Sequence, residues 1–545
     1  MALSFLSMIL QYIPAALALS TLYAISLSIY RVYFSPLSHI PGPKLAAATR
    51  WYELYYDAVQ LGNFYKQIER MHEMYGAFIG TPTSITRARY HTAIPQADVN
   101  EGPIVRITPF EVHISDPSYF NELYNMKLKL HKDPWYYSWL DRSGSIFATM
   151  NPDLHKLRSA PIKKGLSPAS ILRVEHVLKE HFGRLMRKLE ERRDEGKPIN
   201  MTDAYRALAI DVVSDISCPT SMALLDTPDL GHTFHEYVRD YTMFAIWNRQ
   251  FPIIAPLLNS LPRWLIALQG PTALRIVDSL EAQKQQARDV IANDGKSISD
   301  KAFPVIMNEV YKSTELPASE KTPQRLFEEI SILIGAGSET TSHSLLTVTY
   351  YVLANPSILA RLQAELRQHF TEKQRSEILG YKQLEPLPYL TAIITEGLRV
   401  ATGVSGRFPR INKYGPMVYT SPPSPSAPKG RTYIIPPGST ISMSIREMHY
   451  DPACFPSPHT FDPERFLGEA KKENLKWFAP FGRGQRSCVG QNLAMAEMYM
   501  AIGNLFAKWD VRLSEGVGVE DVRMEHECFS PFVKGGSEGV LLDVR

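Results

Sequence analysis

Cysteine is scarce in this sequence, and so is any excess of charge of one sign. Four of the 545 residues are cysteine, and no two of them form a C-x-x-C pair. This scarcity excludes a disulfide framework and a zinc site of the finger type, and it indicates a reducing compartment with at most one working thiolate. The formal net charge of +3 is close to balance for this length, so we expect no nucleic-acid partner.

Charged side chains are missing altogether from Ala2 to Tyr30. About 20 apolar residues suffice to span the hydrocarbon core of a bilayer, and this segment lacks the basic start and the small-residue cleavage site of a signal peptide. We therefore predict a transmembrane anchor over residues 1–30, with a buried core helix as the alternative. Arg31 and Lys44 follow the span, and this asymmetry predicts a single-pass protein whose body lies in the cytosol.

The sequence has no internal repeat, and a proline-rich hinge over residues 31–50 separates the anchor from one large domain, residues 51–545. Apolar residues recur in that domain at helical spacing, with short strand-like pieces beside them, which predicts a mainly α fold with small β-sheets. The predicted helices are 175–194, 201–217, 325–354, 356–370 and 387–400, and the predicted strands are 104–107, 432–435 and 539–544. Residues 77–101 are irregular and lack clear periodicity.

A glycine-rich loop around Cys488, residues 481–490, is the strongest chemical signal in the sequence. A thiolate beneath a metal needs a tight, preset backbone, and Gly482 and Gly490 permit conformations and close approaches that a Cβ would forbid. The apolar segment 493–505 follows as a predicted helix, so the cysteine precedes a helix N-terminus, where the dipole favours thiolate. The alternative is a glycine-rich loop with an inert cysteine.

The loop Phe-Gly-Arg-Gly-Gln-Arg-Ser-Cys-Val-Gly matches F-x-x-G-x-R-x-C-x-G at every fixed position and thereby resembles the haem-binding loop of the cytochrome P450 superfamily. The resemblance implies a cytochrome P450 fold behind the anchor, with Cys488 as the axial ligand of the iron of haem b. It also implies that Arg486 pairs with a haem propionate and that Phe481 shields the ring, with Gly482 and Gly490 completing the site. Thiolate ligation favours O–O cleavage.

Glu396 and Arg399 form an E-x-x-R pair that lies on one face of a predicted helix. Alone, this spacing fits a surface ion pair equally well. The run Phe-Asp-Pro-Glu-Arg-Phe, residues 461–466, resembles the family's P-E-R-F segment, however. The resemblance then implies a buried network of Glu396, Arg399 and Arg465 that supports the haem pocket, and such a network must be complete because one uncompensated charge is costly.

The run Ala-Gly-Ser-Glu-Thr-Thr, residues 336–341, interrupts a long helical pattern with small and polar side chains. Gly335 and Gly337 each weaken a helix interior by about 1 kcal/mol, which suggests the close approach of something bulky; a polar kink is the alternative. The run resembles the family's distal helix. The resemblance implies that Thr340 orders the oxygen ligand and that Glu339 supplies protons, since an acid beside an alcohol can relay them.

Basic residues elsewhere could bind the two haem propionates. Arg407 and Arg410 lie where related enzymes use arginine. His155 and Arg158 resemble the His/Arg helix that contacts haem in fungal members, although Ser159 stands where a second arginine is usual. For His155 and Arg158 the alternative is a solvated helix face.

The resemblance implies a monooxygenase that inserts one atom of O2 into an apolar organic substrate. The sequence around residues 40–45 and 396–410 is similar to that of fungal enzymes of secondary metabolism. This similarity implies that the substrate is a terpenoid or polyketide intermediate and that the protein lies in the endoplasmic reticulum membrane. The sequence shows no flavin- or dinucleotide-binding segment, so electrons are expected from NADPH through a separate P450 reductase. Candidate substrate-lining segments are 135–147, 332–336, 400–405 and 529–532.

Two other functions remain open at this point. One is a haem-thiolate enzyme that rearranges peroxides without a reductase, against which the Glu339–Thr340 pair argues. The other is an inactive haem-binding membrane protein disabled by residues 77–101. The resemblance implies that these residues are an insertion, either a surface loop or a retained intron. Asn200 begins an Asn-Met-Thr glycosylation sequon, which should stay bare if the body is cytosolic.

Overall fold

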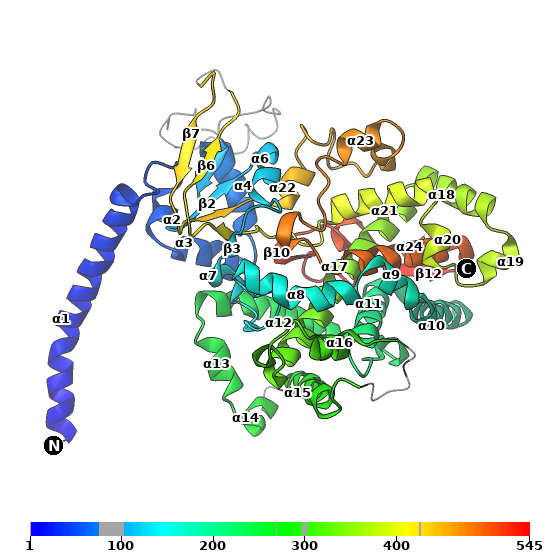
Figure 1. The fold of residues 1–545 in the computed structure, drawn as a ribbon, viewed down its shortest axis with the longest axis horizontal. Coiled ribbons are helices and arrows are strands. Elements are labelled where there is room, and N and C mark those ends of the chain that lie inside the picture. The colour runs from blue at the N-terminus through cyan, green and yellow to red at the C-terminus, as the bar shows by residue number, and fades with distance from the viewer. Residues whose placement is uncertain (1, 76–102, 269, 297–300, 302, 424–426) are drawn as a thin grey trace. The chain divides into compact units, whose positions relative to one another are not determined.

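The computed structural model of the chain describes residues 2–545 except 76–102, 269, 297–300, 302 and 424–426 (Figure 1). The 77–101 insertion therefore lies outside the described residues. The chain divides into two compact units, of which the first comprises Met1–Phe120 and Phe408–Met443 and the second Asn121–Arg407 and Ser444–Arg545. The fold is mainly helical with small sheets, as predicted.

The first unit begins with α1 (Ala2–Ile29), which continues into the π-helix η1 (Tyr30–Phe34). Among the described residues, Tyr12–Phe34 is the one helical stretch long and apolar enough to cross a membrane, and none of that stretch is buried. Short helices come next. α2 (Lys44–Ala48) lies within the predicted hinge, and α3 (Trp51–Leu54), the π-helix η2 (Tyr55–Val59) and α4 (Phe64–Tyr75) follow it.

A small sheet forms the rest of the first unit. Its strands lie in the order β1 (Ile104–Arg106), β2 (Glu111–Ile114), β8 (Thr440–Ser442) and β5 (Arg410–Ile411), and a separate hairpin pairs β6 (Met417–Thr420) with β7 (Thr432–Ile435). β2 and β8 are parallel, whereas β1 pairs with β2 in antiparallel fashion. Phe64, Ile68 and Met71 recur on one face of α4 and pack against Val105 and Ile107 of the sheet edge.

The second unit is built around α17 (Pro323–Ala354). This helix packs against α11 (Met201–Ser217), α15 (Pro271–Ala292), α21 (Pro388–Ala401) and α24 (Gln491–Lys508). Thr322 caps its start by accepting a hydrogen bond from the N–H of Arg325 at 3.3 Å, and Pro323 stands in the first turn, where a missing N–H breaks no helical bond. Apolar side chains cover most of its length, which makes it the central helix of the core.

The second unit contains many further helices. They are α7 (Pro134–Tyr137), α8 (Pro152–Gly165), α9 (Pro168–Arg173), α10 (Glu175–Asp194), α12 (His232–Gln250), α13 (Ile254–Asn259), α14 (Arg263–Ala267), α16 (Ile306–Lys312), α18 (Pro356–His369), α19 (Glu372–Ser376), α20 (Tyr381–Leu384), α22 (Ile445–His449) and α23 (Ala470–Asn474). The 3-10 helices are η3 (Leu224–Asp226), η4 (Ala318–Glu320), η5 (Pro463–Phe466), η6 (Gly484–Arg486) and η7 (Val519–Asp521). The helix α6 (Pro117–Leu123) follows β2.

Two small sheets complete the second unit. β12 (Leu541–Val544) lies between β4 (Ile199–Asn200) and β9 (Val511–Leu513), and β10 (His526–Cys528) forms a hairpin with β11 (Ser530–Phe532); β3 is the short strand His131–Lys132. The predicted helices correspond to α10, α11, α17, α18 and α21, and the predicted strands to β1, β7 and β12, with boundaries that differ by two residues at most.

Candidate active site

The loop before α24 holds Cys488 in a tightly bent backbone. The N–H of Cys488 donates to the carbonyl oxygen of Phe481 at 2.8 Å. Gly482 and Gly484 have φ values of +67° and +73°, in the left-handed region that favours glycine. A Cβ on Gly484 would also lie 2.6 Å from the carbonyl oxygen of Tyr124. These two glycines are therefore required by the loop's conformation.

Cys488 is the one exposed cysteine of the four, since Cys218, Cys454 and Cys528 are buried. It stands directly before the first turn of α24. Desolvation raises the pKa of its thiol, and the backbone N–H groups of Gly490 and Gln491 lower it by hydrogen bonding to the sulfur. An accessible sulfur with N–H donors behind it is a suitable soft ligand for iron.

Arg486 links this loop to the segment before α8. Its Nη1 donates to the carbonyl oxygen of Thr149 at 2.7 Å, and its Nη2 donates to that of Met150 at 2.9 Å. Phe481 packs against the main hydrophobic core. The haem contacts expected of Arg486 and Phe481 stay predictions, but both side chains belong to the same loop as Cys488.

The middle of α17 differs from the buried turns on either side, because Gly335 and Ala336 are exposed. A Cβ on Gly335 would meet nothing within 4 Å, so open space lies beside it. A Cβ on Gly337 would lie 3.1 Å from Val213 of α11. The bulky neighbour that was expected at these glycines is therefore another helix at Gly337. Gly335 instead faces open space that a planar cofactor or a substrate could fill.

The predicted acid–alcohol pair lies in this part of α17. The hydroxyl of Thr340 donates to the carbonyl oxygen of Ala336 at 2.9 Å. The carboxylate of Glu339 accepts a hydrogen bond from Nη2 of Arg206, on α11, at 3.2 Å. Sequence reasoning missed Arg206, whose contact arises only because α11 packs along α17.

The structure brings Glu396, Arg399 and Arg465 together. Nε and Nη2 of Arg399 each donate to a different carboxylate oxygen of Glu396 at 2.7 Å, and Nε of Arg465 lies 3.4 Å from Glu396. Glu396 also accepts the backbone N–H of Asp462 at 2.9 Å. The side chains of Glu396 and Arg399 are 0% exposed. Burial raises the pKa of Glu396, and the hydrogen bonds from Arg399 act against that rise.

His449 connects this network to the segment just before the cysteine loop. Its Nδ1 donates to the carbonyl oxygen of Arg399 (3.2 Å), while its Nε2 accepts the N–H of Ala479 (3.0 Å). The ring also stacks on Phe478, with centroids 5.8 Å apart. Burial lowers the pKa of His449 to about 3, so the imidazole is neutral and Nε2 is free to accept. One histidine among fifteen gave no signal of this role in the sequence.

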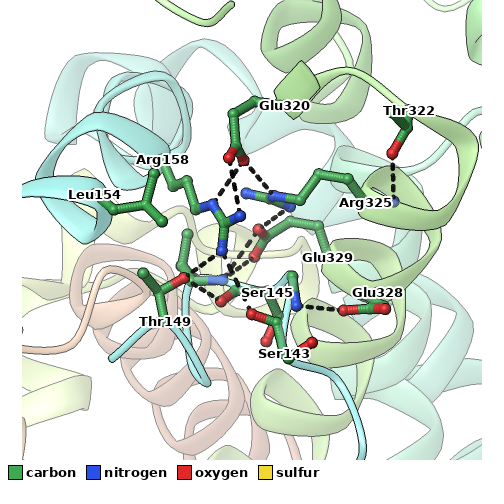
Figure 2. Close-up of polar contacts among 12 residues, drawn as sticks. Ser143, Ser145, Thr149, Leu154, Arg158, Glu320, Thr322, Arg325, Glu328 and Glu329 are labelled. Atoms are coloured by element: carbon green, nitrogen blue, oxygen red, sulfur yellow. Dashed lines mark hydrogen bonds and ion pairs between the residues drawn. The ribbon is translucent and has the colours of Figure 1, made fainter. Parts of the chain in front are cut away.

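The remaining predicted haem contacts lie in different surroundings. His155 is buried in α8, and the side chain of Arg158 is 12% exposed, so neither belongs to a solvated helix face. Arg158 forms a two-point ion pair with Glu320 (Figure 2). Arg410 lies in β5 of the first unit and donates to the carbonyl oxygen of Pro409 at 3.0 Å. The guanidinium of Arg407 lies over the ring of Tyr136, 4.8 Å from its centroid.

Three of the four predicted substrate-lining segments meet around Phe529. The rings of Phe147 and Trp139 lie 5.1 and 5.6 Å from the ring of Phe529. The N–H of Ser405 donates to the carbonyl oxygen of Phe529 at 3.0 Å. A Cβ on Gly403 would lie 3.4 Å from Cβ of Thr340, so the segment 400–405 also packs beside the acid–alcohol pair.

Comparisons with known proteins point the same way. Residues 100–533 match the family model described as cytochrome P450. The chain is 34% identical to a cytochrome P450 monooxygenase of Sordaria araneosa, an alignment that covers 96% of each protein. It is 34% identical to a tryptophan 6-hydroxylase of Fusarium equiseti (95% of this chain, 94% of that protein) and 32% identical to an N-acetyltryptophan 6-hydroxylase of Emericella nidulans (97% and 96%).

Proposed function

Since this chain belongs to the cytochrome P450 family of haem-thiolate monooxygenases, we propose that Cys488 is the cysteine that binds the haem iron. The observation that carries this assignment is that Cys488 is the exposed cysteine, with the backbone N–H groups of Gly490 and Gln491 on its sulfur. The other three are buried, and burial raises the pKa of Cys218 to about 12. Burial raises the pKa of Cys528 as well, so a thiolate at Cys218 or Cys528 would be strongly disfavoured.

Around Cys488, the residues of the loop and of α17 have separate tasks. Bound haem supplies dioxygen activation, with one oxygen atom going to the substrate and the other leaving as water. Arg486, held at the Thr149 and Met150 carbonyls, adds positive charge beside the loop for a haem propionate. Gly335 and Ala336 leave room beside α17. His155 and Arg410 remain candidates for further haem contacts.

Thr340 and Glu339 move protons. Hydroxyl and carboxylate lie on adjacent residues of α17, and the hydroxyl can receive a proton from the acid through water. Arg206 fixes the carboxylate of Glu339 by the 3.2 Å contact. This pair supports oxygen activation rather than peroxide rearrangement, because a peroxide-rearranging enzyme needs no proton supply to oxygen.

The substrate is an apolar organic molecule of fungal secondary metabolism, a terpenoid or polyketide intermediate. The wall of Trp139, Phe147 and Phe529 supports an apolar substrate, because aromatic side chains bury large apolar areas. An indole derivative is the second candidate, since two relatives are named for hydroxylation of tryptophan and N-acetyltryptophan.

The protein is anchored in the endoplasmic reticulum membrane and receives electrons from an NADPH-dependent P450 reductase. α1 supports the anchor. Large apolar side chains are also exposed along residues 247–268, which supports membrane contact of the body. They are Trp247, Phe251, Ile253, Leu257, Leu258, Trp264 and Leu268.

Expression of the full chain with a P450 reductase tests this function. The metabolites of a fungal host should be compared with and without the gene, in cultures grown under isotopically labelled dioxygen. We expect one product that carries one labelled oxygen atom. It should disappear when Cys488 is replaced, and its yield per NADPH should fall when Thr340 is replaced. A haem-loaded, reductase-coupled protein that yields a rearranged but unlabelled product would overturn the proposal.

A further inference from the structure

Four charged side chains form a largely buried cluster beside α17 (Figure 2). They are Arg158 of α8, Glu320 of η4, and Arg325 and Glu329 of α17. Their exposed fractions are 12, 13, 4 and 0%. Two arginines face two glutamates, so the cluster is balanced in charge.

The ion pairs of the cluster form a chain. Nε and Nη2 of Arg158 donate to the two carboxylate oxygens of Glu320 at 2.6 and 2.9 Å. Arg325 contacts Glu320 at 3.3 Å and Glu329 at 2.5 Å. Burial alone would raise the pKa of Glu320, but the charges and hydrogen bonds of Arg158 and Arg325 together outweigh burial, so the pKa lies below its usual value.

The same side chains hold the backbone of the segment 143–149. The N–H of Ile146 donates to Glu329 at 3.2 Å, and the N–H of Gly144 donates to the neighbouring Glu328. Nη1 of Arg158 donates to the hydroxyl of Thr149 at 2.8 Å and to the carbonyl oxygen of Ser143 at 3.4 Å. Both ends and the centre of the segment are thus tied to α8 and α17.

This segment carries Phe147 into the aromatic wall. The Phe147 ring packs edge-on against Phe529 at 5.1 Å and against Tyr137 at 5.6 Å. Glu329 precedes Ala336 by seven residues, so both lie on one face of α17, two turns apart. The contacts of Glu329 therefore fix the wall along the face of α17 that also carries Ala336 and Thr340.

We propose that Arg158 is a positioning residue which, with Glu320, Arg325 and Glu329, latches the segment 143–149 against α17 and fixes Phe147 in the substrate wall. This inference rests on the proposed function. All three guanidinium nitrogens of Arg158 are engaged within the latch. Arg158 is accordingly committed to Glu320, and the propionate role suggested by its resemblance to the fungal His/Arg helix falls to other residues.

Two azoles of different size test the latch in the purified holoenzyme. Imidazole and 4-phenylimidazole both bind haem iron and shift its Soret band, and we expect only the larger one to contact the wall. In Glu320→Gln and Arg158→Lys, we expect the ratio of the two dissociation constants to change by about tenfold, which corresponds to about 1.4 kcal/mol, with haem content unchanged. The double variant should add nothing further, because both residues act through one contact.

The matched control is Glu191→Gln, which breaks the exposed pair between Lys188 and Glu191 on α10 and should leave the ratio unchanged. If Arg158→Lys loses haem while Glu320→Gln retains it, Arg158 binds a propionate and the latch is wrong. An unchanged azole ratio in Glu320→Gln overturns the proposal equally.

Amide hydrogen exchange on the unmodified protein covers the case in which the variants do not fold. The N–H groups of Gly144 and Ile146 should exchange as slowly as those of α17, and exchange at the rate of an open loop would overturn the latch. Failure of the proposed function would appear differently, as a wild-type protein without the thiolate haem spectrum.

Discussion

Replacement of Arg399 by methionine should destabilise the buried network of Glu396, Arg399 and Arg465. The side chain is fully buried, makes two bonds of 2.7 Å to Glu396 and donates to the His449 carbonyl at 2.8 Å. Methionine fills much of the same volume, so lost packing is a minor part of the effect. What remains is the buried carboxylate of Glu396 with Arg465 at 3.4 Å as its nearest cation.

Removing one partner of a buried ion pair typically costs about 3–5 kcal/mol, a large part of the roughly 5–15 kcal/mol that holds a domain folded. We therefore expect Arg399→Met to lower the free energy of unfolding by that amount and to reduce haem content. Denaturant unfolding in detergent, followed by far-ultraviolet circular dichroism, measures the first quantity. The Soret absorbance per mole of protein measures the haem content.

Glu464→Gln is the matched control, because Glu464 adjoins Arg465 but forms an exposed ion pair with Arg361. Exposed pairs contribute about 0–1 kcal/mol, so this variant should unfold almost like the wild type. The reasoning would be refuted if Arg399→Met and Glu464→Gln shifted unfolding equally, since burial would then make no difference.

The remaining predictions concern single side chains. Thr340→Ala should keep haem but divert reductase electrons, so hydrogen peroxide formed per NADPH rises; an unchanged ratio contradicts the role of the hydroxyl. His449→Phe keeps the stack on Phe478 but leaves the Ala479 N–H without its acceptor, and should destabilise by about 1–3 kcal/mol in denaturant unfolding. Asn200 caps α11 by accepting the N–H of Thr202 at 2.9 Å and donating to Glu538 at 3.0 Å; Asn200→Ala should cost about 1 kcal/mol, and a glycosidase-sensitive mass shift at Asn200 would overturn the cytosolic topology.

Local pattern predicted the helices well because each buries one apolar face at its own periodicity. The segment 201–217 was expected as a helix from its apolar spacing and is α11. The cysteine loop could also be predicted from the sequence, because a left-handed backbone at positions 482 and 484 favours glycine, and both residues are glycine. The E-x-x-R network followed from resemblance, because its third member, Arg465, is 66 residues from Arg399.

Contacts between elements that are distant in the sequence could not be predicted from local patterns. Arg206 meets Glu339 because Gly337 lets α11 approach α17, and a sequence does not state which helices are neighbours. Arg158 was assigned to a haem-binding helix because residues 155–158 resemble one. Its partner Glu320 lies 162 residues away, so the local sequence did not indicate this ion pair. Charged residues in a balanced buried cluster look like ordinary surface residues until the fold brings them together.

The reduced carbon-monoxide difference spectrum of the wild type, Cys488→Ser and Cys454→Ser tests the central claim most directly. Cys454 is buried and serves as the control. The account predicts the long-wavelength Soret band of thiolate-bound haem in the wild type and in Cys454→Ser, and its complete loss in Cys488→Ser. Persistence of that band in Cys488→Ser would contradict the assignment of the iron ligand and, with it, the site built around this cysteine.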